Sequence, residues 1–146
     1  MDENNIMTFQ VKGIEILETN LSSPENPIND DTVFGFNLQS NQSFNLDNEL
    51  VIVTCEVDIF DTGYDQKLGH LKVSCLYYLK DLKSYANEEN NSISLPEGMV
   101  VTLNSISIST VRGVMYGVFR GTFLDGAILP VVDPTGEKKE TINKDD

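Results

Sequence analysis

Polar and hydrophobic residues alternate along four successive stretches of the chain, which is the pattern of half-buried β-strands. In the third and fourth stretches the apolar residues mostly hold odd positions, so each stretch has a predominantly apolar face and a more polar one. Connections rich in Asn, Asp, Ser and Pro separate the first three stretches and favour turns. The pattern predicts four antiparallel strands, at Thr8–Glu18, Val33–Phe44, Glu49–Phe60 and Gly69–Lys80.

The third and fourth stretches predict a hairpin. A turn centred on Asp65 places Cys55 opposite Cys75. Both odd-numbered apolar rows then lie on the same side of the sheet, whereas a slip of one residue would send one row to water. In the first stretch the apolar phase changes at Gly13, which predicts a β-bulge there.

The hydrophobic period changes again between Leu95 and Val132. We expect one long helix here, from Gly98 to Phe123, with Gly121 and Gly126 as stop signals. β-Branched residues weaken a helix slightly, but the spacing of three and four residues collects the apolar side chains on one side. These side chains are Leu103, Ile106, Thr110, Val111, Val114, Met115, Val118 and Phe119. The fold class is therefore α+β, a four-stranded antiparallel sheet followed by one long C-terminal helix packed on it.

Length and charge limit the function classes. The 146 residues predict a single domain over residues 1–132, and the polar tail 133–146 is expected to be disordered. A net charge of −13 disfavours nucleic acid and anionic membranes as partners. The charge suits either solubility or attraction of basic polypeptides, and both interpretations stay open. No apolar run is long enough to span a membrane and the acidic N-terminus does not resemble a secretory signal, so we expect a cytoplasmic protein.

Few residues have a pattern that indicates catalysis or metal binding. Cys55 and Cys75 are better explained as packed free thiols than as a functional pair. His70 follows a glycine at a strand start, which is typical of a surface or edge residue. Turn chemistry explains the acids near the hairpin connection better than calcium binding does; these are Asp58, Asp61 and Asp65. We therefore predict no enzyme activity, no cofactor and no metal.

Apolar residues are more numerous than one buried face needs. Val100, Leu103, Ile106 and Val114 could serve the protein's own sheet, and the others widen the apolar stripe of the helix. The fourth strand also carries apolar side chains on both faces. A thick core would explain the surplus, but we favour a surface that packs on other subunits or binds polypeptide. The residues predicted for this surface are Leu76, Tyr78, Val111, Met115, Tyr116, Val118, Phe119 and Phe123.

The end of the predicted helix carries a family resemblance. Arg120-Gly121-Thr122-Phe123, a short spacer and then Ile128-Leu129-Pro130-Val131-Val132 resemble the end of the core helix and the following segment of the SecB export chaperones. The resemblance extends more weakly back to about Phe9. The motif residues are Arg120, Gly121, Thr122, Phe123, Leu129 and Pro130.

The resemblance implies a molecular chaperone that holds unfolded or export-bound polypeptides in apolar grooves between sheet and helix, without ATP. It also implies a homotetramer, a dimer of dimers, that passes its clients to the translocation motor. The chain departs from the family at Ser107–Val111, which replaces a proline-aromatic-alanine segment before Arg112. It also departs at Asp133–Gly136, in place of an aromatic residue, and lacks the family's terminal helix. A SecB-like chaperone of a toxin–antitoxin system stays open as an alternative. A hotdog thioesterase is disfavoured, because the helix follows the strands and carries no acid between Gly98 and Phe123.

Overall fold

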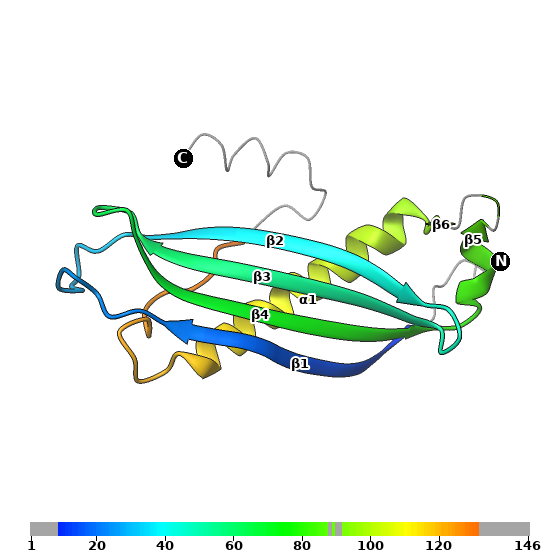
Figure 1. Cartoon of the computed structure of the whole chain (residues 1–146), viewed down its shortest axis with the longest axis horizontal. Helices are drawn as coiled ribbons and strands as arrows, with labels where there is room; N and C mark the ends of the chain where they lie inside the picture. Colours follow the sequence, from blue (N-terminus) through cyan, green and yellow to red (C-terminus); the bar gives the residue numbers. More distant parts are fainter. Residues whose placement is uncertain (1–8, 88, 90–91, 132–146) are drawn as a thin grey trace.

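The computed structural model describes residues 9–87, 89 and 92–131. It shows one four-stranded antiparallel sheet with a long helix lying obliquely across one of its faces (Figure 1). The sheet has the strand order β1-β4-β3-β2, which confirms the predicted fold class. Its elements are β1 (Phe9–Leu21), β2 (Phe34–Asn45), β3 (Leu50–Asp61), β4 (Gln66–Leu79) and the helix α1 (Glu97–Val118).

The connection between β4 and α1 has more structure than the sequence predicts. A 3₁₀ turn at Leu82–Tyr85 buries Leu82. A small antiparallel ribbon of β5 (Ala86–Asn87) and β6 (Ser92–Ile93) follows it. The ribbon lies beyond the end of the sheet where β2 finishes and α1 begins (Figure 1).

The edge strand β1 contains two register shifts against β4, one between Val11 and Gly13 and one between Ile16 and Glu18. The first shift confirms the bulge predicted from the change of phase at Gly13. Pairing continues to Leu21, three residues beyond the predicted end at Glu18. The predicted start at Thr8 lies outside the described residues.

The predicted register of the β3–β4 hairpin is wrong by two residues. Cys55 faces Val73, and Cys75 faces Val53. The turn occupies residues 62–65 with Asp65 in the left-handed conformation at φ 54°, and the ladder shifts next to Ile59. Because an offset of two preserves side-chain direction, the expected agreement of the two apolar rows is confirmed.

The core lies between the inner strands and the helix. Every odd-numbered residue from Val51 to Ile59 on β3, and from Leu71 to Leu79 on β4, is buried. The helix meets this surface with a row of residues spaced by four, which places them on one side of the helix. The row consists of Met99, Leu103, Ser107, Val111 and Met115.

The helix residues divide between the core and the outer surface differently from the prediction. Val111, Met115 and Phe119 were predicted for an external surface, but the structure places all three in the protein's own core, at no more than 1% exposure. Val100, Ile106 and Val114, which were candidates to serve the protein's own sheet, are only half-buried, and Ile106 and Val114 still pack against the core. The β-branched and apolar positions surround much of the helix, so the sequence pattern did not fix its rotation about its axis.

The helix ends at Val118, five residues before the predicted Phe123. The Phe119 backbone N–H still bonds to the Met115 carbonyl, and Gly121 then turns the chain with φ 80°. Gly121 is thus a true stop signal, because this conformation favours glycine. Residues beyond it return to the helix side of the sheet, where they bury Leu124, Ala127 and Leu129. Val132 and the tail 133–146 lie outside the described residues.

A buried polar pair joins the helix to the sheet. The hydroxyls of Tyr77 and Ser107 lie 2.6 Å apart, and both residues are at most 1% exposed. We expect Ser107→Ala to cost about 1–3 kcal/mol of unfolding free energy, because the Tyr77 hydroxyl loses its partner. The double variant Tyr77→Phe/Ser107→Ala should lose clearly less than the sum of the two single variants. Urea unfolding of the four proteins measures this, and additive losses would show that the pair is not coupled.

Candidate functional site

An apolar strip on β1 is left uncovered by the helix. Val11, Ile14 and Ile16 pair with residues of β4 whose side chains are buried under α1, so the three side chains lie on the helix side of the sheet. Each is nevertheless about half exposed, at 48–51%. Leu17, at the second bulge, is exposed to a similar extent. An exposed apolar row on an edge strand is typical of an interaction surface.

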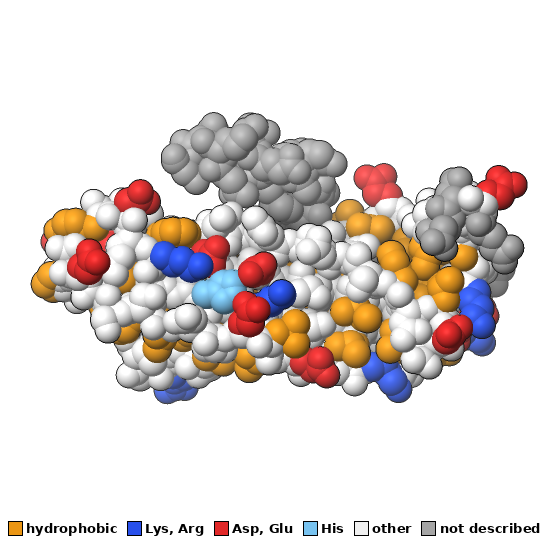
Figure 2. Space-filling model, viewed as in Figure 1, with side chains coloured by type: hydrophobic (Ala, Val, Ile, Leu, Met, Phe, Trp, Pro, Cys, Tyr) orange, Lys and Arg blue, Asp and Glu red, His pale blue; other side chains and the backbone are white. Residues whose placement is uncertain are grey.

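A groove opens at the other side of the sheet, between the end of β2 and the β5–β6 ribbon. Its volume is about 560 Å³, which is in the usual range for ligand sites. The half-buried side chains of Phe44, Leu46 and Ile93 supply its apolar surface. Ser43, Ala86, Asn87 and Ser92 complete the described lining. On the face shown in Figure 2, hydrophobic side chains form a patch towards this end of the molecule, and several charged side chains surround the histidine nearer the middle. We call this feature the end groove.

The outer side of the helix C-terminus is the third apolar feature. Tyr116 is 51% exposed, and Val118 beside it is half-buried. The Arg120 guanidinium lies 5.8 Å from the centre of the Tyr116 ring, within cation–π range. Among the predicted surface residues, Tyr116 is therefore the most accessible.

The remaining predicted residues lie apart from these features. Leu76 and Tyr78 are half-buried on the face of the sheet opposite to α1, which we call the open face. The Tyr78 hydroxyl donates a hydrogen bond to the Glu49 carboxylate at 3.2 Å. Phe123 is half-buried after the helix end and packs against the core. The structure does not bring these three residues together with the helix residues into one site.

The motif Arg120–Phe123 forms the turn that ends the helix. The Thr122 hydroxyl donates to the Phe119 carbonyl at 2.7 Å and accepts from the Leu124 N–H at 3.1 Å. Gly121 supplies the left-handed conformation. These contacts give the motif a structural explanation.

The second half of the motif is held against the helix by a basic side chain. Arg112 donates from Nε to the Leu129 carbonyl at 2.7 Å and from Nη2 to the Pro130 carbonyl at 2.9 Å. Leu129 is buried, whereas Pro130 is exposed.

The sequence analysis missed the end groove. Phe44 ends the predicted second strand, whereas Leu46 and Ile93 lie outside all the predicted elements. An isolated apolar residue within a polar segment was the available signal. It was not sufficient, because the ribbon that turns Ile93 towards β2 has only two residues in each strand.

His70 lies on the inner strand β4 rather than at an edge, since β1 pairs beside it. Its Nδ1 lies 2.7 Å from Asp58 Oδ1, and this hydrogen bond raises the pKa of His70. Burial raises the pKa of Asp58, but hydrogen bonds from His70 and Lys67 outweigh burial and leave that pKa lowered. Protonated imidazole and ionised carboxyl are therefore both favoured in this pair.

Comparison with known proteins identifies the fold. No protein-family model matches the sequence, and no curated protein matches it. Among solved structures, the SecB-like chaperone Rv1957 of Mycobacterium tuberculosis, in complex with a ChAD peptide from the HigA1 antitoxin Rv1956, superposes with a TM-score of 0.54. The match has 12% identity and covers 85% of this chain and 84% of that chain. The chain therefore has the SecB-like fold that the sequence resemblance predicted. Among the described residues, no helix has the length and apolar character required to cross a membrane.

Neither cysteine is placed to react. Both are free and buried, at 0% and 1% exposure. Burial, together with the neighbouring Cys75, raises the pKa of the Cys55 thiol to about 12, and burial also raises that of Cys75. Since the thiolate is the reactive form, the structure assigns these thiols a packing role.

We expect the native thiols to react with Ellman's reagent about 100-fold or more slowly than the same thiols in urea, because reaction requires opening of the core. Measuring release of the coloured thiolate with and without urea checks this. Rapid release from the folded protein would contradict the packing role.

Proposed function

We propose that this protein is a SecB-like molecular chaperone that holds unfolded polypeptide segments against its apolar surface without ATP. The observation that carries the proposal is the amount of apolar side chain that the fold leaves uncovered at two places, the β1 strip and the end groove. Extended apolar segments of a client can bury surface there, at about 25 cal/mol per Å² of apolar area removed from water. No nucleotide is needed, because binding and release of the client depend only on its affinity for this apolar surface.

We assign client binding to the end groove and subunit contact to the β1 strip and the outer side of the helix. The groove is concave and lies beside a short ribbon, which suits an extended peptide. The strip lies on an edge strand whose outer backbone groups can pair with another strand. A homotetramer, built as a dimer of dimers, would cover the strip and also Tyr116 and Val118.

Charge suggests which clients are preferred. The chain has 23 acidic residues against 10 basic ones. Long-range attraction therefore favours segments that combine apolar and basic residues, and it speeds their association at low salt. Cytoplasmic location and transfer of clients to the translocation motor belong to this proposal.

A client that is an antitoxin is the second candidate. The solved SecB-like chaperone noted above is in complex with a peptide from an antitoxin. A narrow client range would then replace general holding of export-bound chains. Binding of several unrelated denatured proteins favours the first candidate, whereas binding of one antitoxin segment alone favours the second.

A charge in the end groove tests the client site. We expect Ile93→Glu to weaken client binding at least tenfold, because an unpaired carboxylate would have to be desolvated by the bound segment. The readout is suppression of aggregation of heat-denatured citrate synthase and affinity for reduced α-lactalbumin. The matched control is Ser94→Glu, which adds the same charge at the neighbouring exposed position. An Ile93→Glu protein that keeps the wild-type unfolding curve and full client binding would exclude the end groove.

The β1 strip generates a separate prediction about assembly. We expect Ile14→Glu/Ile16→Glu to reduce the number of chains per particle, because each subunit contact would bury two charges. Glu15→Lys is the control, since residue 15 points to the open face. Light scattering after size-exclusion chromatography at micromolar concentration gives the mass. A wild-type protein that is already monomeric would remove the assembly proposal and leave the end groove untouched.

A further inference from the structure

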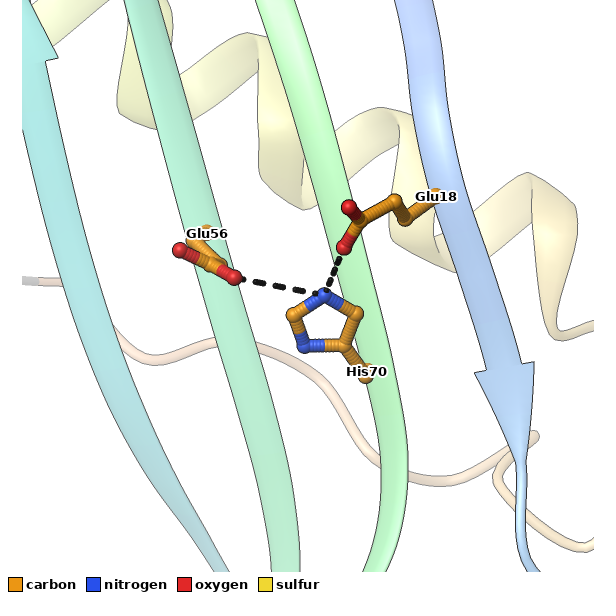
Figure 3. A group of neighbouring side chains, drawn as sticks. All are labelled: Glu18, Glu56 and His70. Atoms are coloured by element: carbon orange, nitrogen blue, oxygen red, sulfur yellow. Dashed lines mark hydrogen bonds and ion pairs between the residues drawn. The ribbon is translucent and has the colours of Figure 1, made fainter.

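Three adjacent strands bring a mixed set of nitrogen and oxygen ligands together on the open face, far in sequence from one another. His70 comes from β4, Glu18 from β1 and Glu56 from β3, and the two carboxylates point to the imidazole from either side (Figure 3). His70 Nε2 lies 2.7 Å from Glu18 Oε1 and 3.4 Å from Glu56 Oε2. One ligand atom from each residue lies within 4.8 Å of the others.

The hydrogen bonding of the ring leaves one position in need of a cation. Asp58 Oδ1 lies 2.7 Å from His70 Nδ1 and Glu18 Oε1 lies 2.7 Å from Nε2, so both ring nitrogens face acceptors and a neutral ring can donate to only one of them. We take Nδ1 as the donor to Asp58. In the neutral ring Nε2 then presents a lone pair to two carboxylate oxygens, which also present lone pairs. Such an arrangement is stable only when a second ring proton or a metal ion lies between these atoms.

We propose that His70, Glu18 and Glu56 bind one divalent transition-metal ion of the zinc or manganese class. Ligand atoms about 2.0–2.2 Å from one metal ion lie roughly 3–3.5 Å from each other. The contacts of Nε2, at 2.7 and 3.4 Å, are close to this range. Asp58 completes the arrangement as the carboxylate that fixes the tautomer, a common partner of metal-bound histidine. An imidazole ligand favours transition metals over magnesium and calcium, which prefer oxygen ligands alone.

Surrounding charges fit this assignment. Lys67 Nζ lies 3.0 Å from Asp58 Oδ1, the same oxygen that contacts the ring, so the lysine partly neutralises this carboxylate. Lys72 lies opposite both Glu18 and Glu56 in the strand register and is the cation that competes with the metal. The His70 side chain is only 15% exposed, so the ring is held in place and water has limited access to it.

Metal binding would connect the edge strand β1 to both inner strands. Glu18 directly follows the second bulge of β1, where the pairing with β4 is interrupted. A ligand that binds only the folded chain raises its stability in proportion to the logarithm of ligand concentration. The ion would therefore fix the end of the strand that carries the exposed apolar strip.

The experiment titrates the whole chain with zinc chloride by isothermal titration calorimetry, and with cobalt(II) followed by visible absorption. We expect one ion per chain and a higher thermal midpoint with zinc. Glu18→Gln, at a half-exposed side chain, should weaken binding at least tenfold, as should His70→Ala. Asp58→Ala should weaken binding about 10- to 100-fold through the ring orientation.

Glu15→Gln is the matched control, because it removes an acid from the same strand and the same face. It should leave the affinity unchanged. Zinc binding that persists in both Glu18→Gln and His70→Ala would show adventitious binding and overturn the proposal. Absence of binding, with nitrogen NMR showing a proton on Nε2 whether or not zinc is present, would also overturn it, because the proton would then be the only occupant.

Discussion

Everything in this structure depends on the packing of one helix against a sheet that is wider than the helix. Four strands at about 4.8 Å spacing span roughly 19 Å, whereas a helix with its side chains is about 10–12 Å across. The helix therefore covers the inner strands β3 and β4, whose helix-side residues are fully buried, and leaves the edge strands partly open. The half-exposed isoleucines of β1 follow from this mismatch in width, because they belong to the covered side but lie beyond the reach of the helix.

The same constraint explains why the chain continues to pack after the helix ends. An oblique helix leaves a corner of the sheet uncovered, and the segment after Gly121 fills it with Leu124, Ala127 and Leu129. An added Cβ at Gly69 would lie 2.5 Å from Leu124 Cδ1, so the glycine lets the Leu124 side chain pack close to β4, and a larger residue would force that side chain to shift. Arg112 then fixes the segment through two backbone carbonyls. The sequence motif that suggested the family, Arg120–Phe123 with Leu129 and Pro130, thus ends the helix and covers the core.

Sequence alone predicted the parts of the fold in which apolar residues recur at regular spacing. The odd-numbered rows of β3 and β4 were assigned to one side, and the bulge at Gly13 and the stop at Gly121 were located. Two properties without a periodic signal were not predicted. The hairpin register depends on the length of the turn and on a bulge near Ile59. Together they can move the register by two residues without altering the alternation of apolar and polar side chains. Helix rotation was ambiguous because Ile106 and Ile108, two residues apart, are equally apolar while only Ile108 is buried.

The candidate site could be predicted only in outline for a related reason. A surplus of apolar residues indicated that some surface is open, but which residues are open depends on what the helix covers. Val111 and Met115 are used inside the fold, so the apolar surface that stays open comes from residues that the helix does not reach, such as Phe44, Leu46 and Ile93 in the end groove. The open face was equally out of reach of pattern analysis, since Glu18, Glu56 and His70 become neighbours only through the strand order β1-β4-β3. The helix side of the sheet is thus apolar, whereas the open face carries the charged cluster as well as the half-buried Leu76 and Tyr78. A peptide bound on the helix side would therefore leave intact the charged cluster, which links the strands on the open face.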